Sequence, residues 1–418
     1  MAANEKQEGA LSPYRVLDLT DEKGLLCGKL MGDMGADVIK VERPGGDPAR
    51  NIGPFYHDEP DPEKSLFWFA LNTSKRGITL DIETIDGNEL FRNLVETADF
   101  VIESFPPGYM DSLGLGYSDL EKINPGIIMV SITPFGQTGP YKDYKAPDIV
   151  AWAVSGVMSS FGDPDRPPIR VSHHSQSYYH AASEAAAGAS IALYMRGVTG
   201  EGQHVDVSIQ ESTLRCSEGL TASWALRDSI KKRGQSFYGA NLKVTRVWEC
   251  KDGLTKWAYS GGEGGNRRSK PFVDWMDSEG MATDFLKSMD WDQFSLLETT
   301  QEIIDLISEP TAIFVKKYTK AEFMEGAVKY RVMSYPIATT ADILGNRQLA
   351  ERGYWKELEH PELGESITYP GAFSKATETP PDVSRRAPLI GEHNKEIYCE
   401  ELGLSTDELV ILKQAEVI

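Results

Sequence analysis

The sequence predicts an α/β protein whose first part is a doubly wound, largely parallel sheet. Apolar strand-like runs alternate with helix-like runs through residues 1–150, and this alternation is typical of βαβ units. The 418 residues exceed one ordinary core, so we expect the chain to divide into about two domains. A hydrophobic content of 40% beside a charged content of 25% indicates a water-soluble globular protein.

The expected strands are short runs rich in Val, Ile and Leu. Short apolar runs of this composition are typical of strands. They are expected at residues 14–19, 36–42, 77–82, 99–104, 126–133 and 202–209.

The expected helices lie between and after these strands. The first covers residues 25–35 and is closed by Gly35, since a glycine after an apolar-periodic segment is a common helix stop. The second, residues 87–98, is amphipathic. Two more are expected at 148–162 and 178–196, and a further helix follows the last strand.

The composition changes near Arg227, where the chain becomes basic, glycine-rich and irregular. We therefore expect a first domain segment over 1–226 and a smaller domain over 227–335. The remainder, 336–418, returns to short strands and loops and ends in a loop that leads into a helix.

Charge and targeting features narrow the class of protein. The formal net charge of −20 argues against nucleic acid as a partner, because phosphate binding needs a basic surface. The N-terminal residues lack the apolar core of a signal peptide, and no apolar stretch reaches the about 18 residues that span a membrane. We expect a cytoplasmic protein with no membrane partner. The cysteines are far apart, so we expect reduced thiols and no zinc site at Cys27, Cys216, Cys250 and Cys399.

Several common motifs are missing. The glycines after the first strand, at 24, 28, 32 and 35, have the wrong spacing for a dinucleotide fingerprint. There is no GxSxG elbow of a serine hydrolase. The run "SGGEGGNRR" (260–268) lacks the GK[ST] ending of a P-loop; it fits a flexible turn, with an anion-binding nest as the alternative.

Three of the seven histidines gather in "VSHHSQSYYH" (171–180). His173 and His174 are adjacent and point apart on a regular element, and His180 lies on another face of a helix that contains His174. No metal-ligand spacing such as HExxH occurs there, so we expect no metal.

Basic side chains follow two of the expected strands. Arg43 ends the segment "VIKVER", and Lys142 and Lys145 follow "GIIMVSIT". Loops at the carboxyl ends of parallel strands form the ligand crevice of a doubly wound fold. This placement predicts a site for a phosphate-bearing small molecule, with plain surface charge as the alternative.

Seven segments together resemble the class III CoA-transferase family, which includes formyl-CoA transferase, carnitine CoA-transferase and alpha-methylacyl-CoA racemase. The resemblance runs in order from about Arg15 to Leu404. The segments are "VLDLT", "LMGDMGADVIKVERPGGDPAR", "SLFWFALNTSKRGITLDI", "ADFVIESFPPGYMDSLGLGY", "INPGIIMVSITPFGQTGPY", "TGEGQHVDVSIQES" and "RAPLIGEHNKEI".

The resemblance implies an architecture and a CoA site. Members are interlocked, ring-like dimers with a Rossmann-like large domain from both chain ends, here 1–226 and 336–418, and a small α+β domain between them. CoA is a substrate, and no other cofactor is implied. The positions that match the family's CoA contacts are Arg43, Leu80, Phe105 and Lys145, together with Ser104, which replaces an asparagine of formyl-CoA transferase.

The resemblance also points to a missing nucleophile. The family's transferases use one aspartate, which forms acyl anhydrides and a CoA thioester in turn. When this sequence is matched to the family's pattern, the position of that aspartate holds Tyr178. No aspartate occurs between Asp165 and Asp206, and a phenol with a pKa near 10 is a poor substitute. We therefore expect a subunit without a catalytic residue of its own, complemented by a homologous aspartate-bearing partner in a heterodimer. The pattern resembles two-subunit members that move CoA from succinyl-CoA to benzylsuccinate in anaerobic aromatic degradation.

Other interpretations remain open at this point. A homodimer could use a shifted carboxylate, Asp148 or Glu184, although Glu184 is poorly aimed on its helix. Racemase chemistry and a non-catalytic CoA-binding subunit are further alternatives. In the subunit without a nucleophile, His173, His174, Tyr178 and His180 line a vestigial or acceptor-binding pocket, with simple packing near the interface as the alternative.

Overall fold

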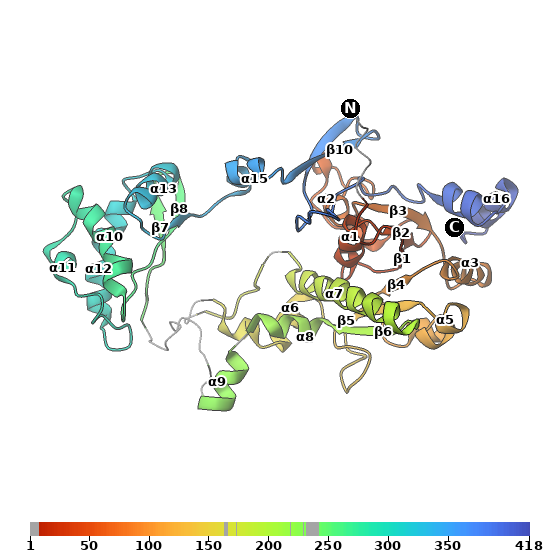
Figure 1. Cartoon of the computed structure of the whole chain (residues 1–418), viewed down its shortest axis with the longest axis horizontal. Helices are drawn as coiled ribbons and strands as arrows, with labels where there is room; N and C mark the ends of the chain where they lie inside the picture. The colour runs from red at the N-terminus through yellow and green to blue at the C-terminus, as the bar shows by residue number, and fades with distance from the viewer. Residues whose placement is uncertain (1–7, 163–165, 173, 218, 229, 231–241) are drawn as a thin grey trace. The chain divides into compact units, whose positions relative to one another are not determined.

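The computed structural model describes residues 8–162, 166–172, 174–217, 219–228, 230 and 242–418 (Figure 1). The chain divides into two compact units. The first consists of 1–158, 170–218 and 349–418, and the second of 159–169 and 219–348. The first unit is thus built from both ends of the chain.

The first unit contains a six-stranded parallel sheet with the order β3-β2-β1-β4-β5-β6. Its strands are β1 Arg15–Asp18, β2 Asp37–Glu42, β3 Lys75–Thr79, β4 Phe100–Glu103, β5 Ile128–Thr133 and β6 His204–Ser208. Strand β1 pairs with β2 on one side and with β4 on the other, so the order reverses between β1 and β4. This is a doubly wound sheet, and the α/β prediction is confirmed.

Each face of the sheet packs against its own set of helices. On one face, Phe100 and Ile102 share a core with α1 (Leu25–Asp33) and α7 (Gln176–Thr199). On the opposite face, Val101 shares a core with residues of the helices α3 (Ile85–Val95), α5 (Tyr117–Ile123) and α16 (Thr406–Gln414). Glu103 therefore points to the α5 side, because successive strand residues alternate between faces.

The C-terminal segment packs along β3. The Ser74 backbone N–H donates to the carbonyl of Arg385 (2.9 Å), and the Tyr398 hydroxyl donates to the carbonyl of Thr79 (2.7 Å). The segment begins with an antiparallel hairpin, β10 Trp355–His360 and β11 Glu365–Pro370.

The second unit combines a small antiparallel sheet with helices around an aromatic core. Its strands are β7 Val247–Cys250, β8 Gly253–Lys256 and β9 Tyr335–Pro336. Its helices include α10 Gly265–Ser278, α12 Gln301–Val315 and α13 Lys320–Lys329. The buried rings of Trp257, Phe272 and Trp275 fill the space between them.

The remaining elements are short. The helices are α2 Leu66–Leu71, α4 Tyr109–Ser112, α6 Asp148–Val154, α8 Ile209–Leu214, α9 Leu220–Arg227, α11 Asp284–Ser288, α14 Thr340–Leu344 and α15 Arg347–Glu351. Single helical turns lie at Pro48–Asn51, Tyr56–Asp58, Val157–Ser160 and Arg215–Ser217, and a π-helix lies at Glu396–Glu401. Among the described residues, no helix is long and apolar enough to cross a membrane.

One expected helix is shorter than the sequence suggested. The run 148–162 does not form a single helix, because α6 ends at Val154 and Gly156 has a φ of 78°. A glycine in this left-handed conformation ends a helix at little steric cost. The break leaves α6 as a short element whose first residue, Asp148, faces the start of α7.

Candidate active site

Arg43 and Phe105 come together at the carboxyl edge of the sheet. The exposed Arg43 guanidinium pairs with the Glu83 carboxylate (Nη2 to Oε1, 2.5 Å) and donates a hydrogen bond from Nη2 to the Tyr109 hydroxyl oxygen at 3.0 Å. The Tyr109 ring lies 4.5 Å from the Phe105 ring. A cation beside two aromatic rings fits an anionic ligand that carries a flat base. The sequence prediction did not include Glu83 or Tyr109, because it considered only basic side chains after strands, and neither of these residues is basic.

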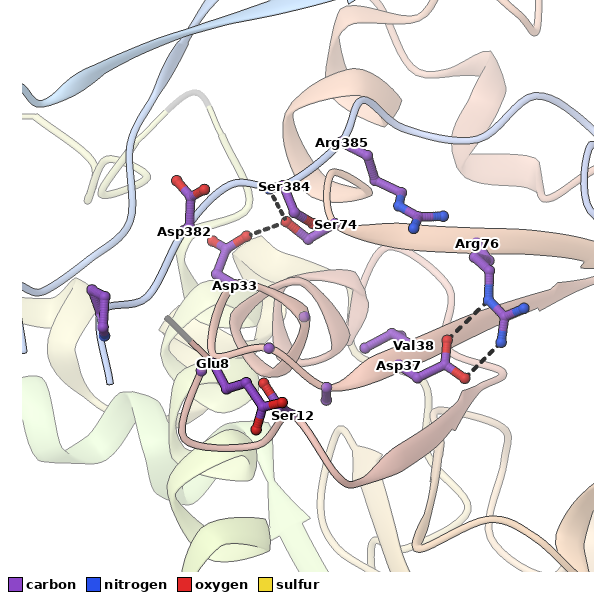
Figure 2. A pocket seen from close by; sticks show the side chains of 15 residues that line it. Glu8, Ser12, Asp33, Asp37, Val38, Ser74, Arg76, Asp382, Ser384 and Arg385 are labelled. Atoms are coloured by element: carbon purple, nitrogen blue, oxygen red, sulfur yellow. Dashed lines mark hydrogen bonds and ion pairs between the residues drawn. The ribbon is translucent and has the colours of Figure 1, made fainter. Parts of the chain in front are cut away.

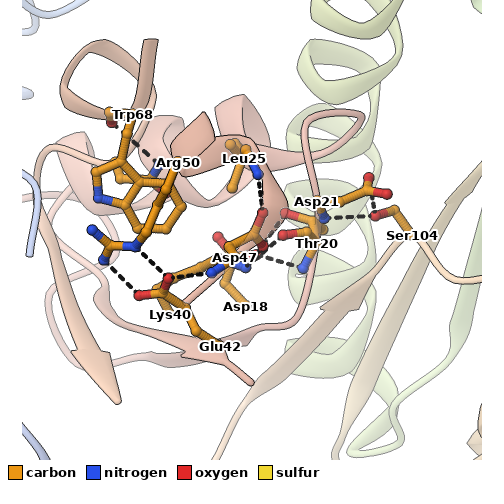
Figure 3. Close-up of polar contacts among 12 residues, drawn as sticks. Asp18, Thr20, Asp21, Leu25, Lys40, Glu42, Asp47, Arg50, Trp68 and Ser104 are labelled. Carbon is orange, nitrogen blue, oxygen red and sulfur yellow. Dashed lines mark hydrogen bonds and ion pairs between the residues drawn. The ribbon is translucent and has the colours of Figure 1, made fainter. Parts of the chain in front are cut away.

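Leu80 and Ser104 lie at the same edge but are buried. The Leu80 backbone N–H donates to the carbonyl of Glu42 (2.6 Å), and its side chain belongs to the core. The Ser104 hydroxyl donates to Asp21 Oδ1 (2.8 Å) and accepts from the Asp21 backbone N–H (2.9 Å). Ser104 thereby anchors the loop after β1, and Figure 3 shows this contact.

Buried charges fix the base of that loop (Figure 3). Asp18 accepts from the Thr20 backbone N–H (3.0 Å) and hydroxyl (2.7 Å) and pairs with Lys75 Nζ at 2.8 Å. Lys40 donates to the carbonyl of Thr20 and pairs with Asp47. Burial raises the pKa of Asp18, but the charges of Lys75 and Lys40 lower it more, so this carboxyl remains ionised.

Lys145 belongs to the loop that leaves this edge after β5. Its side chain is exposed, in the segment between β5 and α6. The structure therefore places Arg43, Ser104 and Phe105 directly after β2 and β4 at one edge of the sheet, with Leu80 beneath them, while Lys145 lies farther along the segment between β5 and α6.

Tyr178 lies in the first turn of α7 and is 5% exposed. It packs in the core on the α7 face of the sheet. Burial raises the pKa of its phenol, and the nearby charges of Glu22, Asp148 and Asp21 raise it further. The phenol is therefore neutral at physiological pH, which makes it a poor nucleophile.

Asp148 is one of the two carboxylates considered as a replacement nucleophile, but both of its oxygens are engaged in hydrogen bonds or an ion pair. Oδ1 accepts from the Ser177 backbone N–H (2.9 Å) and hydroxyl (2.6 Å), and Oδ2 pairs with Arg170 Nε at 2.8 Å. The residue is 4% exposed. The carboxylate thus caps the start of α7, where the N–H groups of a helix lack internal partners.

This contact predicts a structural role for Asp148. We expect Asp148→Asn to lower the free energy of unfolding by about 1–3 kcal/mol, because a charge-assisted cap and an ion pair are weakened. Urea unfolding followed by circular dichroism measures this, with Asp119→Asn as a control whose side chain is 34% exposed and which should change stability by less than about 0.5 kcal/mol. Unchanged stability with loss of transferase activity would instead identify Asp148 as the nucleophile.

Glu184 and the histidines lie farther along α7 or before it. Glu184 accepts from the Ser212 hydroxyl (2.8 Å) and pairs with Arg215 (3.3 Å). The exposed His180 contacts the Cys216 sulfur at 3.5 Å. His174 precedes the helix, and His173 lies outside the described residues. Among the residues that the structure describes, no group of three or more His, Cys, Asp or Glu side chains is arranged to hold a metal ion.

A cavity lies at the opposite edge of the sheet, where the strands begin. It has a volume of about 330 Å³ and is lined by Asp33, Asp37 and Arg76 near the amino ends of β2 and β3 (Figure 2). Ser74 donates to Asp33, and Arg76 pairs with Asp37. The cavity is rich in carboxylates and lies away from the edge where doubly wound sheets bind ligands, so it is a poor site for an anionic substrate.

Comparison with known proteins agrees with this geometry. The profile of CoA-transferase family III matches residues 11–394. The chain is 36% identical to the succinyl-CoA:(R)-benzylsuccinate CoA-transferase subunit BbsE of Thauera aromatica, over 93% of both chains. It is 32% identical to the succinyl-CoA–D-citramalate CoA-transferase of Chloroflexus aurantiacus, over the full length of both. The crystal structure of a CAIB/BAIF family protein from Brucella suis superposes with a TM-score of 0.80 at 28% identity, over 94% of this chain and 100% of that one.

The protein belongs to CoA-transferase family III. The resemblance seen in the sequence is therefore confirmed, and the enzyme class is CoA-transferase.

Proposed function

We propose that this chain is a subunit of a class III CoA-transferase that works with a homologous, aspartate-bearing partner. The observation that carries the proposal is Tyr178, a buried and neutral phenol in the column where the family has its nucleophilic aspartate. The two carboxylates considered as substitutes, Asp148 and Glu184, are engaged in hydrogen bonds and ion pairs.

The substrates are proposed from the relatives. The name of the Thauera protein specifies succinyl-CoA, (R)-benzylsuccinate and a subunit. We infer that the present chain serves a transfer from succinyl-CoA to a dicarboxylic acid of the benzylsuccinate type, with CoA as the only carrier.

The partner's aspartate performs the covalent steps in this proposal. Its carboxylate attacks the thioester carbonyl of succinyl-CoA, the carbon–sulfur bond breaks, and a succinyl-aspartyl anhydride and the CoA thiolate form. The thiolate then attacks the aspartyl carbonyl and releases succinate. The acceptor carboxylate reverses both steps, so the acyl-CoA product leaves and the aspartate is regenerated.

This chain contributes binding groups to the proposed reaction. Arg43, directly after β2, and Lys145, in the segment between β5 and α6, are exposed cations and suit the phosphates of CoA. Phe105, paired with Tyr109, suits the adenine ring. Ser104 holds the loop after β1 in place through Asp21. Leu80 supports this surface from below as part of the core.

An exposed apolar stripe on α7 supports the proposal that a partner chain binds here. Ile191, Tyr194 and Val198 follow helical spacing on one face of the helix and are 65%, 74% and 69% exposed. Large apolar side chains gathered on one exposed helix face are characteristic of a protein–protein interface. A homologous subunit that covers this face fits the interlocked dimers implied by the family resemblance.

Coexpression tests the proposal. We expect the chain alone to show no CoA transfer from succinyl-CoA, and the purified complex with an aspartate-bearing homologue to show transfer. Transfer by the chain alone would contradict the proposal. CoA binding without transfer in any pairing would instead indicate a non-catalytic CoA-binding subunit.

A further inference from the structure

A hydrogen-bonded chain of three side chains runs behind the loop after β4. Glu103 is the last residue of β4 and is 3% exposed. Its Oε2 accepts the backbone N–H of Phe105 at 2.7 Å, and its carboxyl also shares a hydrogen bond with Ser131. The Ser131 hydroxyl lies 2.8 Å from His204 Nε2. A buried acid is thus connected to an imidazole on the edge strand.

The register of the sheet brings these residues together. Glu103 is paired with Ser131 on β5, and His204 on β6 is paired with Met129, two residues before Ser131. All three polar side chains therefore point to the α5 face, where the His204 ring stacks on Tyr117 with centroids 5.9 Å apart. They line a cavity of about 420 Å³.

The same cavity touches the back of the loop that carries the proposed CoA contacts. Pro106, Pro107 and Gly108 line the cavity. The neighbouring Phe105 and Tyr109 pack on each other, and Tyr109 contacts Arg43. A change at Glu103 thus reaches the CoA side of the loop through one residue, Phe105.

Glu103 is also able to change its charge at neutral pH. Burial raises the pKa of its carboxyl to about 7, although the hydrogen bonds from Ser131 and Phe105 act in the opposite direction. Charged or titratable groups face it from every neighbouring element. They are Asp21 and Lys23 after β1, Asp111 in α4, Tyr117 in α5, Lys142 after β5 and His204 in β6.

We propose that Glu103 is a positioning residue that sets the conformation of the Ser104–Gly108 loop through its bond to the Phe105 N–H, so that CoA binding to this chain depends on the protonation of Glu103. The inference rests on the proposed function, because it assumes that CoA binds at Arg43 and Phe105.

The direction of the effect follows from the hydrogen bonds. The carboxylate accepts from both the Phe105 N–H and the Ser131 hydroxyl, whereas the neutral acid must use one oxygen as a donor. CoA binding requires the loop after β4 to be ordered. It therefore favours the ionised form of Glu103 and lowers the pKa of this carboxyl. By linkage, affinity for CoA rises as the pH increases through about 7 and levels off above it.

Calorimetric titration of the full-length chain with CoA from pH 6 to 8.5 tests this. We expect the dissociation constant of the wild type to fall about fivefold between pH 6 and 8. Glu103→Gln keeps an acceptor for the Phe105 N–H but cannot ionise, so its affinity should stay at the acid value of the wild type. Ser131→Ala should move the midpoint of the profile to higher pH, because a donor to the carboxylate is lost.

Glu96→Gln is the matched control, since Glu96 is exposed at the end of α3. It should keep the wild-type profile, because it retains Glu103, whereas any pH dependence left in Glu103→Gln belongs to CoA itself. The same pH profile in Glu103→Gln and the wild type overturns the inference, as does an affinity that falls with rising pH. A wild-type chain that binds no CoA at any pH overturns the proposed CoA site as well.

Discussion

Replacing the partner subunit's nucleophilic aspartate with alanine is expected to lower kcat of the complex by about 10⁴-fold or more, because a covalent nucleophile has no substitute. Tyr178→Phe in this chain should leave kcat within about threefold, since removal of one neutral hydroxyl outside the covalent steps costs little. Steady-state transfer from succinyl-CoA, measured on both complexes, gives the two values.

Two matched variants separate this result from a nucleophile in the present chain. Asp148→Asn and Glu22→Gln each remove one acidic group whose charge reaches Tyr178. A 10⁴-fold loss in either variant, in a complex that still forms, would place the nucleophile here and would contradict the proposal.

Lys75→Met is expected to lower the free energy of unfolding by about 3–5 kcal/mol, because it leaves the buried Asp18 without its ion-pair partner. Lys75 Nζ donates to Asp18 Oδ2 and to the carbonyl of Leu25, both at 2.8 Å, and both charged side chains are fully buried. The loop after β1 depends on Asp18 through Thr20, so the loss should also loosen that loop. Equilibrium unfolding in urea measures the change.

The control is Lys122→Met, which removes an exposed lysine paired with Asp119 at 3.0 Å and should cost less than about 1 kcal/mol. The double variant Asp18→Asn/Lys75→Met should recover part of the loss, because no unpaired charge remains. Equal effects of Lys75→Met and Lys122→Met would show that the buried pair does not stabilise the fold.

The sheet was predictable because its strands are apolar runs whose pattern needs no knowledge of distant contacts. The predicted run 36–42 coincides with β2 within a residue, whereas the predicted strand 77–82 lies two to three residues beyond β3. The break at Gly156 was missed, since the apolar pattern of 148–162 continues across a backbone conformation that the pattern does not reveal.

The site was less predictable, because it depends on contacts between segments far apart in the sequence. Arg43 was singled out as a basic residue after a strand, but its partner Tyr109 is 66 residues away. Asp148 was weighed as a nucleophile, and only its bonds to Ser177, 29 residues on, indicate a cap. The sequence did not predict a polar cluster at Glu103, because Glu103 meets Ser131 only through the register of β4 and β5.

Mass spectrometry of the complex after incubation with succinyl-CoA and trapping with hydroxylamine or borohydride tests the absence of a nucleophile here most directly. We expect the modified carboxylate to be the aspartate of the partner subunit, with no modified acidic residue in this chain. A stoichiometric adduct on Glu22, Asp148 or Glu184, formed when this chain is incubated alone, would show that it carries the acyl group itself.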